Sequence, residues 1–521
     1  MPSDGKESTS AWMREGSAPS SALLAQNATA DVCVIGAGIA GLSVAYHLAL
    51  EGQTVVVLDA GHVGGGQTGR TTAHLSNALD DRYAVIERVH GEAGARGAAE
   101  SHSAAIARIE RIAKDESIEC DFERVNGYLF LSSDESEDLL EGERNAALRA
   151  GLIGVEYLPR SPIECFETGP CLVFPRQAQC HPLKYLAGLA EAVVRRRGRI
   201  HGSTRVRSVA GGKTARVETD SGHVVTAQAV VVATNTPVND LVAIHTKQAA
   251  YRTYAIAARI TRGSVRKALL WDTNDPYHYV RVHPFDGSSD LLIIGGEDHK
   301  TGQADDEHEP ARYSRLESWG RARCSTVGRV EFRWSGQLLE TIDGLAFIGR
   351  NPADEPNVYV VTGDSGMGMT HGTIAGMLIG DLIMGRDNPW AALYDPSRKI
   401  LRAVTDFARE NLNVAAQYAD WLTAGDVDSR EQIQSGCGAV IRRGLSKVAV
   451  FRDEQGGFHE CSAICPHLGC LVNWNTAERS WDCPCHGSRF DPYGVVLNGP
   501  VTSNLAPAGE GGGLGASGVG G

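Results

Sequence analysis

The chain of 521 residues is longer than one typical domain, and its 42% apolar and 22% charged residues are ordinary for a globular protein, so we expect several packed domains. Its formal net charge of -13 argues against a nucleic acid partner, because that binding depends on Lys and Arg neutralising phosphates, and against docking on an anionic membrane surface. No stretch offers the roughly 18 uninterrupted apolar residues of a membrane span, and the N-terminal residues lack the apolar core of a signal peptide, so we expect a cytoplasmic protein without a membrane span.

Both ends of the chain have compositions that predict disorder. Residues 1–29 are rich in Ser, Ala and charged side chains and are expected to form a flexible arm, and residues 508–521 are mostly Gly, Ala and Ser. Such segments bury too little apolar surface to offset the entropy lost on ordering.

The first regular elements follow the arm. Asp31–Gly36 is typical of a short buried strand, Leu42–Leu50 of an apolar helix, and Thr54–Leu58 of a second strand that ends at Asp59. This order of strand, helix, strand and acidic residue is that of a dinucleotide-binding unit, in which the acid accepts hydrogen bonds from the ribose hydroxyls.

Three glycines connect the first strand to the helix in the sequence Gly-Ala-Gly-Ile-Ala-Gly. Gly36 permits the tight turn, Gly38 lets the backbone approach a pyrophosphate, and Gly41 allows close packing of the helix. The helix N-terminus then faces the anion. The motif predicts a dinucleotide but leaves FAD and NAD open.

Further strands are expected far along the chain. They combine β-branched runs with flanking Gly, Pro or Asn: Val224–Ala233, Tyr277–His283, Leu291–Gly295 and Asn357–Thr362. We therefore expect an α/β (α+β) fold in which a Rossmann-like nucleotide domain is discontinuous and contains an inserted mixed-sheet substrate domain.

Four stretches carry a family resemblance: Thr204–Val206, Val230–Asn235, Gly64–Thr72 and Thr362–Thr370. Together they resemble the D-amino-acid-oxidase and sarcosine-oxidase family of flavoproteins over roughly residues 30 to 390. The resemblance implies FAD as the dinucleotide. It also implies that Thr362–Thr370 joins a strand to a helix and presents backbone amides and the positive helix end to an anionic reduced flavin.

The resemblance assigns FAD contacts beyond the first glycine motif and Asp59. They are Thr68, Gly69, Arg70, Thr71, Val206, Gly366, Met367, Gly368, Met369 and Thr370. Some relatives attach their flavin covalently, but no cysteine occurs in Gly363–Thr370, and His74 lies one place away from the tethering histidine of other relatives. We therefore predict a noncovalent flavin.

Catalytic candidates lie in the segment Trp271–Arg281, which is expected to be one strand. Alternation along a strand places Tyr277, Tyr279 and Arg281 on one face, where the arginine could hold a substrate carboxylate. Aromatic packing beside a surface arginine is the alternative explanation. Further candidates are Arg70, His74 and Lys247.

Two short motifs near the C-terminus contain Cys and His at metal-ligand spacing. They are Cys465-Pro-His467 and Cys483-Pro-Cys485-His486, with fifteen residues between His467 and Cys483. Both motifs resemble the Rieske signature, which implies a [2Fe-2S] cluster held by Cys465, His467, Cys483 and His486. A structural zinc site is the alternative that two cysteines and two histidines leave open.

The Rieske resemblance has two further implications. Cys470 and Cys485 match the positions of a loop-clamping disulfide, although a pair of free thiols is the alternative. Ser488 keeps one hydroxyl directed at a ligand sulfur, whereas Phe490 replaces a tyrosine that supplies another. With one donor fewer, the cluster potential is expected below the top of the Rieske range.

The domain organisation follows from these motifs. We expect the FAD-dependent oxidoreductase domain at residues 30–390, with substrate-domain segments at about 80–175 and 240–335. A helical linker at 391–427 and a small all-β Rieske domain at 428–507 complete the chain.

The resemblance implies dehydrogenation of an amine or amino acid, with a hydride passing to the flavin and single electrons leaving through the cluster to a one-electron acceptor protein. A Rieske oxygenase would need a mononuclear iron site downstream, and only 35 residues follow His486. A non-catalytic redox sensor or electron-transfer module is the alternative from another class.

Overall fold

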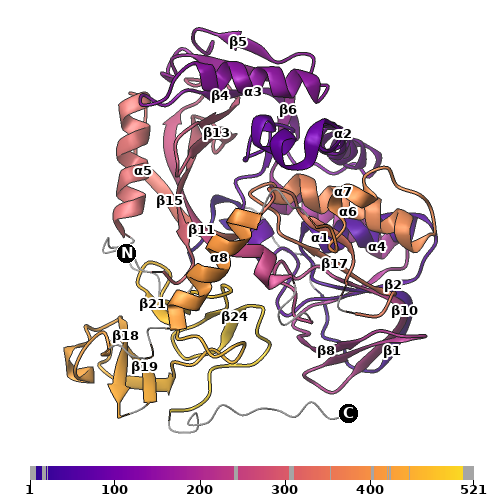
Figure 1. Ribbon diagram of the computed structural model, residues 1–521, viewed down its shortest axis with the longest axis vertical. Coiled ribbons are helices and arrows are strands. Elements are labelled where there is room, and N and C mark those ends of the chain that lie inside the picture. The colour runs from indigo at the N-terminus through magenta and orange to yellow at the C-terminus, as the bar shows by residue number, and fades with distance from the viewer. Residues whose placement is uncertain are drawn as a thin grey trace. The chain divides into compact units, whose positions relative to one another are not determined.

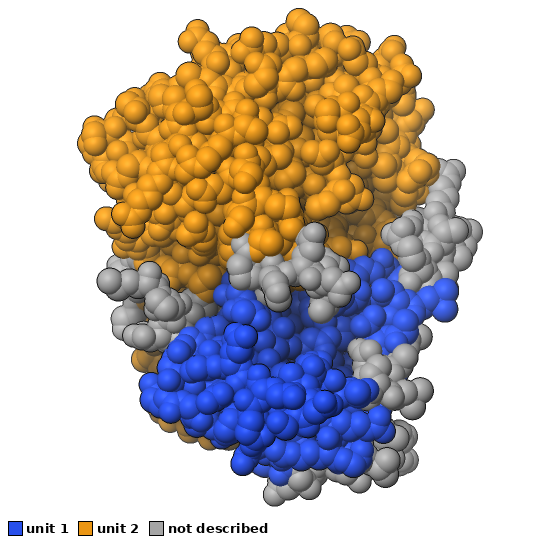
Figure 2. Space-filling model, turned by 90° about the vertical axis from the view of Figure 1, so that its left-hand side faces the viewer, with its two compact units in different colours: residues 1–7, 300–310, 409–521 blue, residues 8–299, 311–408 orange. Residues whose placement is uncertain are grey.

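The computed structural model describes residues 8–14, 19, 21–239, 244–303, 310–352, 354–399, 404–418, 421, 424–444 and 446–508. The chain forms two compact units, coloured separately in Figure 2. The large unit comprises residues 8–299 and 311–408, and the small unit comprises residues 1–7, 300–310 and 409–521. The expected disordered tail lies outside the described residues, apart from its first position.

The large unit contains a sheet of mainly parallel strands in the order β16-β17-β10-β1-β2-β7, with β9 and β8 added beside β10. Its strands are β1 (Ala28–Ile35), β2 (Val55–Leu58), β7 (Arg199–His201), β8 (Val206–Ala210), β9 (Ala215–Thr219), β10 (Val224–Val232), β16 (Phe347–Arg350) and β17 (Val358–Thr362). The central strands are continuous apolar runs, as parallel strands buried on both faces require. The predicted Rossmann-like, discontinuous sheet is confirmed.

Two helices of this layer lie side by side, α1 (Ile39–Leu50) and α6 (Gly368–Ile383), as Figure 1 shows. Glycines on α6 make the close approach possible. A Cβ at Gly372 would lie 3.0 Å from the Ala40 amide nitrogen, and a Cβ at Gly376 would lie 2.8 Å from Ser43. The packing brings the N-termini of α1 and α6 to the same edge of the sheet. A third helix, α4 (Pro182–Arg195), also contacts α1.

A second sheet completes the large unit, with the strand order β15-β11-β14-β13-β12-β4-β6-β3 and β5 beside β6. Its strands are β3 (His74–Leu75), β4 (Glu123–Phe130), β5 (Glu156–Leu158), β6 (Cys171–Gln179), β11 (Gln248–Thr261), β12 (Leu269–Asp272), β13 (His278–Pro284), β14 (Ser289–Lys300) and β15 (Val330–Thr341). The accompanying helices are α2 (Tyr83–Asp115), α3 (Asp138–Arg149), α5 (Pro310–Arg323) and α7 (Ala391–Tyr394).

The N-terminal segment corrects the expectation of a flexible arm. Residues Ala11–Arg14 form a short 3-10 helix, and the Trp12 side chain is fully buried. Its indole nitrogen donates to the Thr71 carbonyl (2.6 Å), and the Ser10 hydroxyl donates to the Gly69 carbonyl (2.6 Å). Burial of one tryptophan offsets the entropy lost when a short polar segment becomes ordered. The average composition of the segment does not reveal this single anchoring residue.

The small unit has two antiparallel sheets. One contains β18 (Gly438–Arg443), β19 (Ser446–Arg452) and β20 (Phe458–Ser462), and the other contains β21 (Asn473–Asn475), β22 (Ser480–Asp482), β23 (Arg489–Phe490) and β24 (Val496–Asn498). Helix α8 (Val404–Gln417) precedes them and continues from the large unit into the small one. In the part of the chain that the structure describes, no helix has the length and apolarity that crossing a membrane would need.

One segment groups differently from the expected substrate-domain range of 240–335. Residues 300–310, which follow β14, belong to the small unit. The Asn473 side chain donates to the Gly302 carbonyl (2.7 Å), and Gln303 and Asn413 exchange hydrogen bonds through their side-chain amides. Lys300 also pairs with Glu410 at 2.6 Å. These polar contacts explain the grouping.

Candidate active site and metal centre

The turn between β1 and α1 admits only glycine at two positions. Gly36 has a φ of +107°, and a Cβ there would collide with the Ala233 carbonyl oxygen. A Cβ at Gly41 would collide with the Gly36 carbonyl oxygen. At Gly38, a Cβ would lie only 3.1 Å from the Thr68 hydroxyl. Because glycine has no Cβ, the Gly38 backbone stays open to a ligand. Helix α1 begins at this turn without a side-chain cap on its Gly38 N-cap.

Asp59 stands at the end of β2, beside the same turn. Its two carboxylate oxygens accept from the amides of Ala37 and Gly61, each at 2.7 Å. Burial raises the pKa of Asp59, and these two amides oppose the rise. The Thr68 hydroxyl accepts from the Ile39 amide at 3.0 Å and so holds the second glycine-rich loop against the helix start.

Among the remaining predicted contacts of that loop, Gly69 and Arg70 are buried and Thr71 is half-buried. The Arg70 guanidinium donates to the Ser335 carbonyl (3.0 Å) and the Ser8 hydroxyl (3.1 Å), while its own carbonyl accepts from the Trp334 indole (2.8 Å). Arg70 is therefore held by β15 and the N-terminal segment, and its place among the catalytic candidates stays a prediction. Val206 is buried where β8 begins.

The turn from β17 to α6 is pinned to strand β15. Its Ser365 amide donates to the Leu339 carbonyl at 2.9 Å, and the Leu339 amide donates to the Asp364 carboxylate at 3.3 Å. Gly363 and Gly366 have φ values of +69° and +71°. Helix α6 then starts at Gly368 without a side-chain cap on its Met367 N-cap, so amides of its first turn remain available to a ligand.

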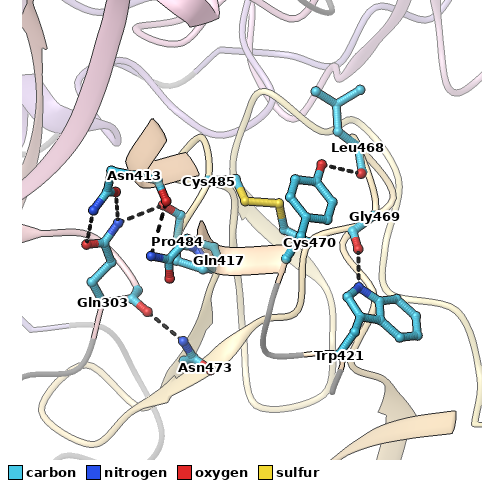
Figure 3. The surroundings of a disulfide bond; sticks show 12 residues. Gln303, Asn413, Gln417, Trp421, Leu468, Gly469, Cys470, Asn473, Pro484 and Cys485 are labelled. Atoms are coloured by element: carbon cyan, nitrogen blue, oxygen red, sulfur yellow. Dashed lines mark hydrogen bonds between the residues drawn. A yellow bond between two sulfur atoms is a disulfide. The ribbon is translucent and has the colours of Figure 1, made fainter. Parts of the chain in front are cut away.

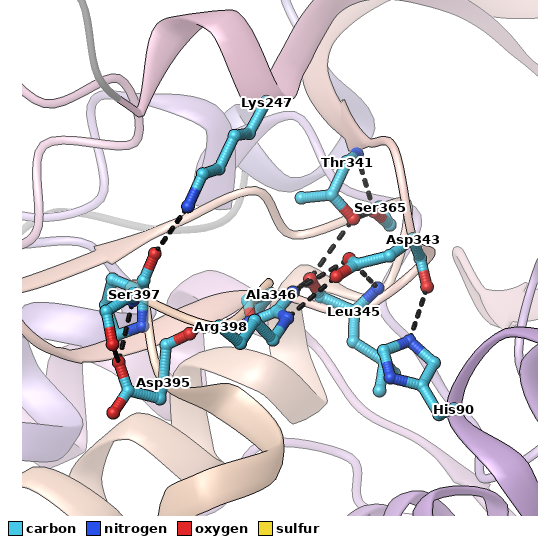
Figure 4. Close-up of polar contacts among 11 residues, drawn as sticks. His90, Lys247, Thr341, Asp343, Leu345, Ala346, Ser365, Asp395, Ser397 and Arg398 are labelled. Carbon is cyan, nitrogen blue, oxygen red and sulfur yellow. Dashed lines mark hydrogen bonds and ion pairs between the residues drawn. The ribbon is translucent and has the colours of Figure 1, made fainter. Parts of the chain in front are cut away.

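A buried ion pair supports this turn from the other side, as Figure 4 shows. Arg398 pairs with Asp343 at 2.7 Å, and the Asp343 backbone carbonyl contacts a ring nitrogen of His90 at 2.7 Å. Thr341, two residues before Asp343, hydrogen-bonds the Ser365 hydroxyl. The predicted catalytic candidate Lys247 belongs to this scaffold, because its ammonium donates to the Pro396 carbonyl at 2.9 Å.

The two uncapped helix ends, the glycine turn and Asp59 fit the groups of FAD. Thr68 accepts from the first amide of α1, and the positive ends of α1 and α6 lie at one sheet edge and suit a pyrophosphate and a reduced flavin, both of which are anionic. The residues predicted in this turn also lie there: Gly366, Met367, Gly368, Met369 and Thr370.

The expected strand Trp271–Arg281 is instead a hairpin of β12 and β13, and Tyr277 directly precedes β13. Pro276 has no backbone amide to donate to a neighbouring strand, which favours a break there. The Arg281 guanidinium is buried and donates to the carbonyls of Thr72, Ala73 and Cys180. All three bonds come from Nη1, so this nitrogen is engaged by the backbone, and a role of Arg281 in holding a substrate carboxylate stays a prediction.

Tyr277 faces the flavin-side turn, and the Tyr279 ring lies 5.5 Å from the Tyr277 ring. The Tyr277 hydroxyl donates to the Asp80 carboxylate at 2.9 Å, and the Tyr279 hydroxyl shares a hydrogen bond with Thr253 at 2.8 Å. A Cβ at Gly366 would collide with Asp80 and would lie 3.4 Å from the Tyr277 hydroxyl. Both tyrosines thus lie beside the predicted flavin contacts.

His74 has both ring nitrogens engaged. One contacts the Thr72 hydroxyl at 3.1 Å and the other the Val280 carbonyl at 3.3 Å. Burial lowers the pKa of His74 to about 3. A histidine in these contacts does not present a nitrogen for attachment to a flavin, which agrees with the predicted noncovalent cofactor.

Sequence reasoning missed the acidic side chains around the two tyrosines. They come from separate parts of the chain: Asp80, Asp81, Asp298, Glu340 and Asp364. No local signal could have found them, because strand pairing and the flavin-side turn alone bring them together.

The small unit holds the predicted metal ligands on two loops with the same backbone pattern. In the first loop, the Cys465 amide donates to the carbonyl five residues on, and the amide of Gly469 donates back to Cys465. In the second, Cys483 and Gly487 repeat both bonds. Each glycine has a positive φ, +78° and +75°, which a side chain would disfavour.

The four predicted ligands lie together. The rings of His467 and His486 are 4.8 Å apart and half-buried, and the thiols of Cys465 and Cys483 are buried and in contact. The His467 amide and the Ser488 hydroxyl face the Cys465 sulfur, and the contact with Cys483 is the largest influence lowering the pKa of that thiol. Two sulfurs on one side and two imidazoles on the other fit a Rieske cluster.

Cys470 and Cys485 form a disulfide that links the two loops, with their Cα atoms 6.5 Å apart (Figure 3). The Cys483 sulfur lies within 4.8 Å of both disulfide sulfurs, but sulfurs bonded to each other are poor metal ligands. Two aromatic side chains hold the first loop: Tyr418 donates to the Leu468 carbonyl at 2.8 Å and Trp421 donates to the Gly469 carbonyl at 3.2 Å.

The fold and both sites define a flavin and iron-sulfur redox protein. Comparison with known families agrees: the model of the FAD dependent oxidoreductase family matches residues 31–382, and the Rieske [2Fe-2S] domain model matches residues 423–508. The chain belongs to the FAD dependent oxidoreductase family and carries a C-terminal Rieske domain. It is an oxidoreductase that binds FAD and a [2Fe-2S] cluster, so both predicted cofactors are confirmed.

Its relatives include a Rieske 2Fe-2S iron-sulfur protein of Bacillus subtilis, 31% identical over 95% of this chain and 96% of that protein. The gamma-glutamylputrescine oxidoreductase of Escherichia coli is 29% identical over 70% of this chain and 85% of its own length. Among solved structures, glycine oxidase from Geobacillus kaustophilus matches the fold with a TM-score of 0.58 at 18% identity, over 72% of this chain and all of that chain. The chain is thus similar in sequence to an oxidoreductase of gamma-glutamylputrescine and shares its fold with glycine oxidase.

Proposed function

We propose that this enzyme dehydrogenates an amine or amino acid and delivers the electrons singly to an acceptor protein. When bound, FAD supplies a two-electron acceptor and the cluster supplies a one-electron carrier. The observation that carries the proposal is the hydrogen-bonded pair Tyr277 and Asp80 beside Gly366. An ionisable pair at the flavin-side turn is placed to handle the proton of a substrate.

Asp80 has the properties of a proton acceptor for an amine. Desolvation by the surrounding protein atoms raises the pKa of its carboxyl to about 7, although Asp80 itself is exposed, and the Tyr277 hydroxyl that donates to it opposes part of the rise. A base is most effective when its pKa lies near the working pH. An amine is protonated at neutral pH and must lose that proton before its carbon can give up a hydride. Tyr277 orients the carboxylate, and Asp80 takes the proton.

Anaerobic titration tests the proposal. The holoenzyme is mixed with a panel of amines and amino acids, the flavin absorbance is followed, and oxidised cytochrome c is then added as a one-electron acceptor. At least one compound should bleach the flavin, and cytochrome c should then be reduced over many turnovers. A flavin that dithionite bleaches but no amine or amino acid does would contradict the proposal.

The Asp80→Asn variant tests whether Asp80 acts as a base in the reaction or only supports FAD binding. We expect flavin bleaching to slow by about 100-fold, as for other lost general bases, with FAD content unchanged. Asp286→Asn is the matched control, because Asp286 lies in a surface turn where it pairs with Arg259 at 2.8 Å. It should retain the rate of the parent enzyme.

A further inference from the structure

The loop that carries the predicted cluster ligand Cys483 is covered by a segment from elsewhere in the chain. This covering segment, Lys300–Gln303, follows β14 and lies within the residues that match the FAD dependent oxidoreductase family (31–382), outside those that match the Rieske domain (423–508). In the structure it nevertheless belongs to the small unit. The surroundings of the cluster site therefore include residues that the Rieske match does not contain.

Gly302 lies directly against the backbone of the Cys483 loop. A Cβ on Gly302 would lie 2.7 Å from the Asp482 carbonyl oxygen and 2.7 Å from the Pro484 nitrogen, so no side chain fits there. Gly302 also has a φ of +71°, a conformation that residues with a side chain rarely adopt. The peptide bond between Cys483 and Pro484 is therefore packed against the backbone of the covering segment.

Gln303 reaches the next peptide group of the same loop. Its side-chain amide donates to the Pro484 carbonyl at 3.4 Å, as Figure 3 shows. The same peptide group carries the amide of Cys485, which hydrogen-bonds to the Cys483 sulfur. A donor on the carbonyl holds the peptide plane in place and polarises its N–H. Gln303 is thus connected to the Cys483 sulfur through a single peptide group.

The covering segment is itself held by two elements of the small unit, β21 and α8. The Asn473 side chain donates to the Gly302 carbonyl at 2.7 Å. The side-chain amides of Gln303 and Asn413 exchange two hydrogen bonds, at 2.5 and 3.3 Å (Figure 3). A turn closes the segment, because the backbone amide of Gln303 donates to the Lys300 carbonyl at 3.2 Å. These contacts fix Gly302 and Gln303 independently of the Cys483 loop, so the segment can position that loop.

We propose that Gly302 and Gln303 are positioning residues for the [2Fe-2S] cluster. They fix the loop that carries Cys483 and hold the Cys485 amide toward its sulfur. Hydrogen bonds to the sulfurs stabilise the reduced cluster, so this orientation raises the reduction potential. Because the covering segment continues from β14, the chain of the flavin domain takes part in setting the potential of the cluster. The inference does not depend on which compound the enzyme oxidises.

The Gln303→Leu variant of the full chain removes the side-chain amide and keeps a similar size. Protein-film voltammetry should give a lower midpoint potential for the cluster, and a chelator should remove its iron about tenfold faster, as expected when a residue that supports a metal ligand is lost. FAD content and the flavin potential should equal those of the parent. Gln417→Leu is the control, because the Gln417 amide donates to the Asn413 carbonyl of its own helix at 3.4 Å.

The Gly302→Ala variant tests the backbone contact. Its Cβ must displace the peptide bond between Cys483 and Pro484, so we expect shifted g values in the EPR spectrum of the reduced cluster, with FAD content unchanged. Gly444→Ala is the matched control, since Gly444 has a similar φ of +64° and a Cβ there meets nothing within 4 Å. It carries the same backbone strain and should keep the parental EPR spectrum.

The outcomes decide each residue separately. A parental cluster potential in Gln303→Leu would overturn the role of Gln303, and a parental EPR spectrum in Gly302→Ala would overturn that of Gly302. Equal changes in the control variants would show a general effect on the small unit and would also overturn the proposal. If Gly302→Ala does not fold, the potential of Gln303→Leu decides it.

Discussion

Ser488 and Phe490 determine how many hydroxyl groups face the cluster sulfurs. Ser488 is buried and directed at Cys465, and Phe490 is buried in the core that also contains both ligand cysteines. Hydrogen bonds to sulfur stabilise the reduced cluster and raise its potential.

Phe490→Tyr should therefore raise the cluster potential, and Ser488→Ala should lower it. Protein-film voltammetry measures both changes, with the flavin potential as an internal control that should not move. Opposite signs, or equal shifts of flavin and cluster, would show that the two side chains act through structure and not through bonds to sulfur.

The raised pKa values of Asp80, Asp298 and Asp364 predict a pH dependence. The folded protein favours the protonated forms of these carboxyls, so their stabilising contribution is complete at low pH and is lost as the pH rises through about 6 to 7. The groups that face them are Tyr277, Tyr279, His278, Glu297, Arg312 and Asp81.

The measurement compares the parent enzyme with Asp298→Asn between roughly pH 5 and pH 8. The Tm of the parent should fall relative to the variant as the pH rises. His278 is held by Asp272 at 3.0 Å, and its pKa is raised, so its loss of charge at higher pH removes a cation that faces Asp298 and adds to the fall in Tm. A Tm difference that is independent of pH would rule out titration of Asp298.

Oxygen should react slowly with the reduced enzyme. Ile293 on β14 is fully buried among apolar side chains that include Trp12 and Trp334. An apolar residue does not stabilise the negative charge that develops on oxygen. Stoichiometric peroxide during aerobic turnover, measured with a peroxidase assay, would contradict this expectation.

At the scale of elements, local patterns predicted the first βαβ unit and the two cluster loops. Each is a contiguous segment in which glycines, apolar runs and ligands have fixed spacing. The prediction of a single strand over Trp271–Arg281 was wrong because alternation alone ignored Pro276. The acidic side chains around the two tyrosines could not be predicted, because they lie on β14, β15 and two loops that only the tertiary structure brings together.

The α1 turn gives a prediction at this scale. Gly38→Val should abolish FAD binding, because its Cβ would lie 3.1 Å from Thr68 and its methyl groups would enter the space of the pyrophosphate. Gly66→Ala is the control, since a Cβ there meets nothing within 4 Å. Flavin released by acid precipitation, measured per mole of protein, should fall to near zero in the first variant only. Flavin that stays attached to the precipitated parent protein would show a covalent bond.

For the whole molecule, the central question is whether the two cofactors work in sequence. The chain joins β14, which carries Asp298, directly to residues 300–303, and in the small unit Gln303 donates to the carbonyl of Pro484 at 3.4 Å, between Cys483 and Cys485. Fusion in one chain keeps the two cofactors at a high effective concentration. An intramolecular path from flavin to cluster is the arrangement that such a fusion favours.

His486→Ala tests that path. Loss of one imidazole ligand should remove the Rieske spectrum and leave FAD bound, because the residues predicted to contact FAD belong to the large unit and His486 to the small one. Substrate should still bleach the flavin at the parental rate, whereas reduction of cytochrome c should fall at least 100-fold. His459→Ala is the matched control, since this histidine of the small unit pairs with Asp453 at 2.7 Å and has a 40% exposed side chain. If the His486 variant reduced cytochrome c as fast as the parent, electrons would leave the flavin directly and the cluster would have a structural or regulatory role.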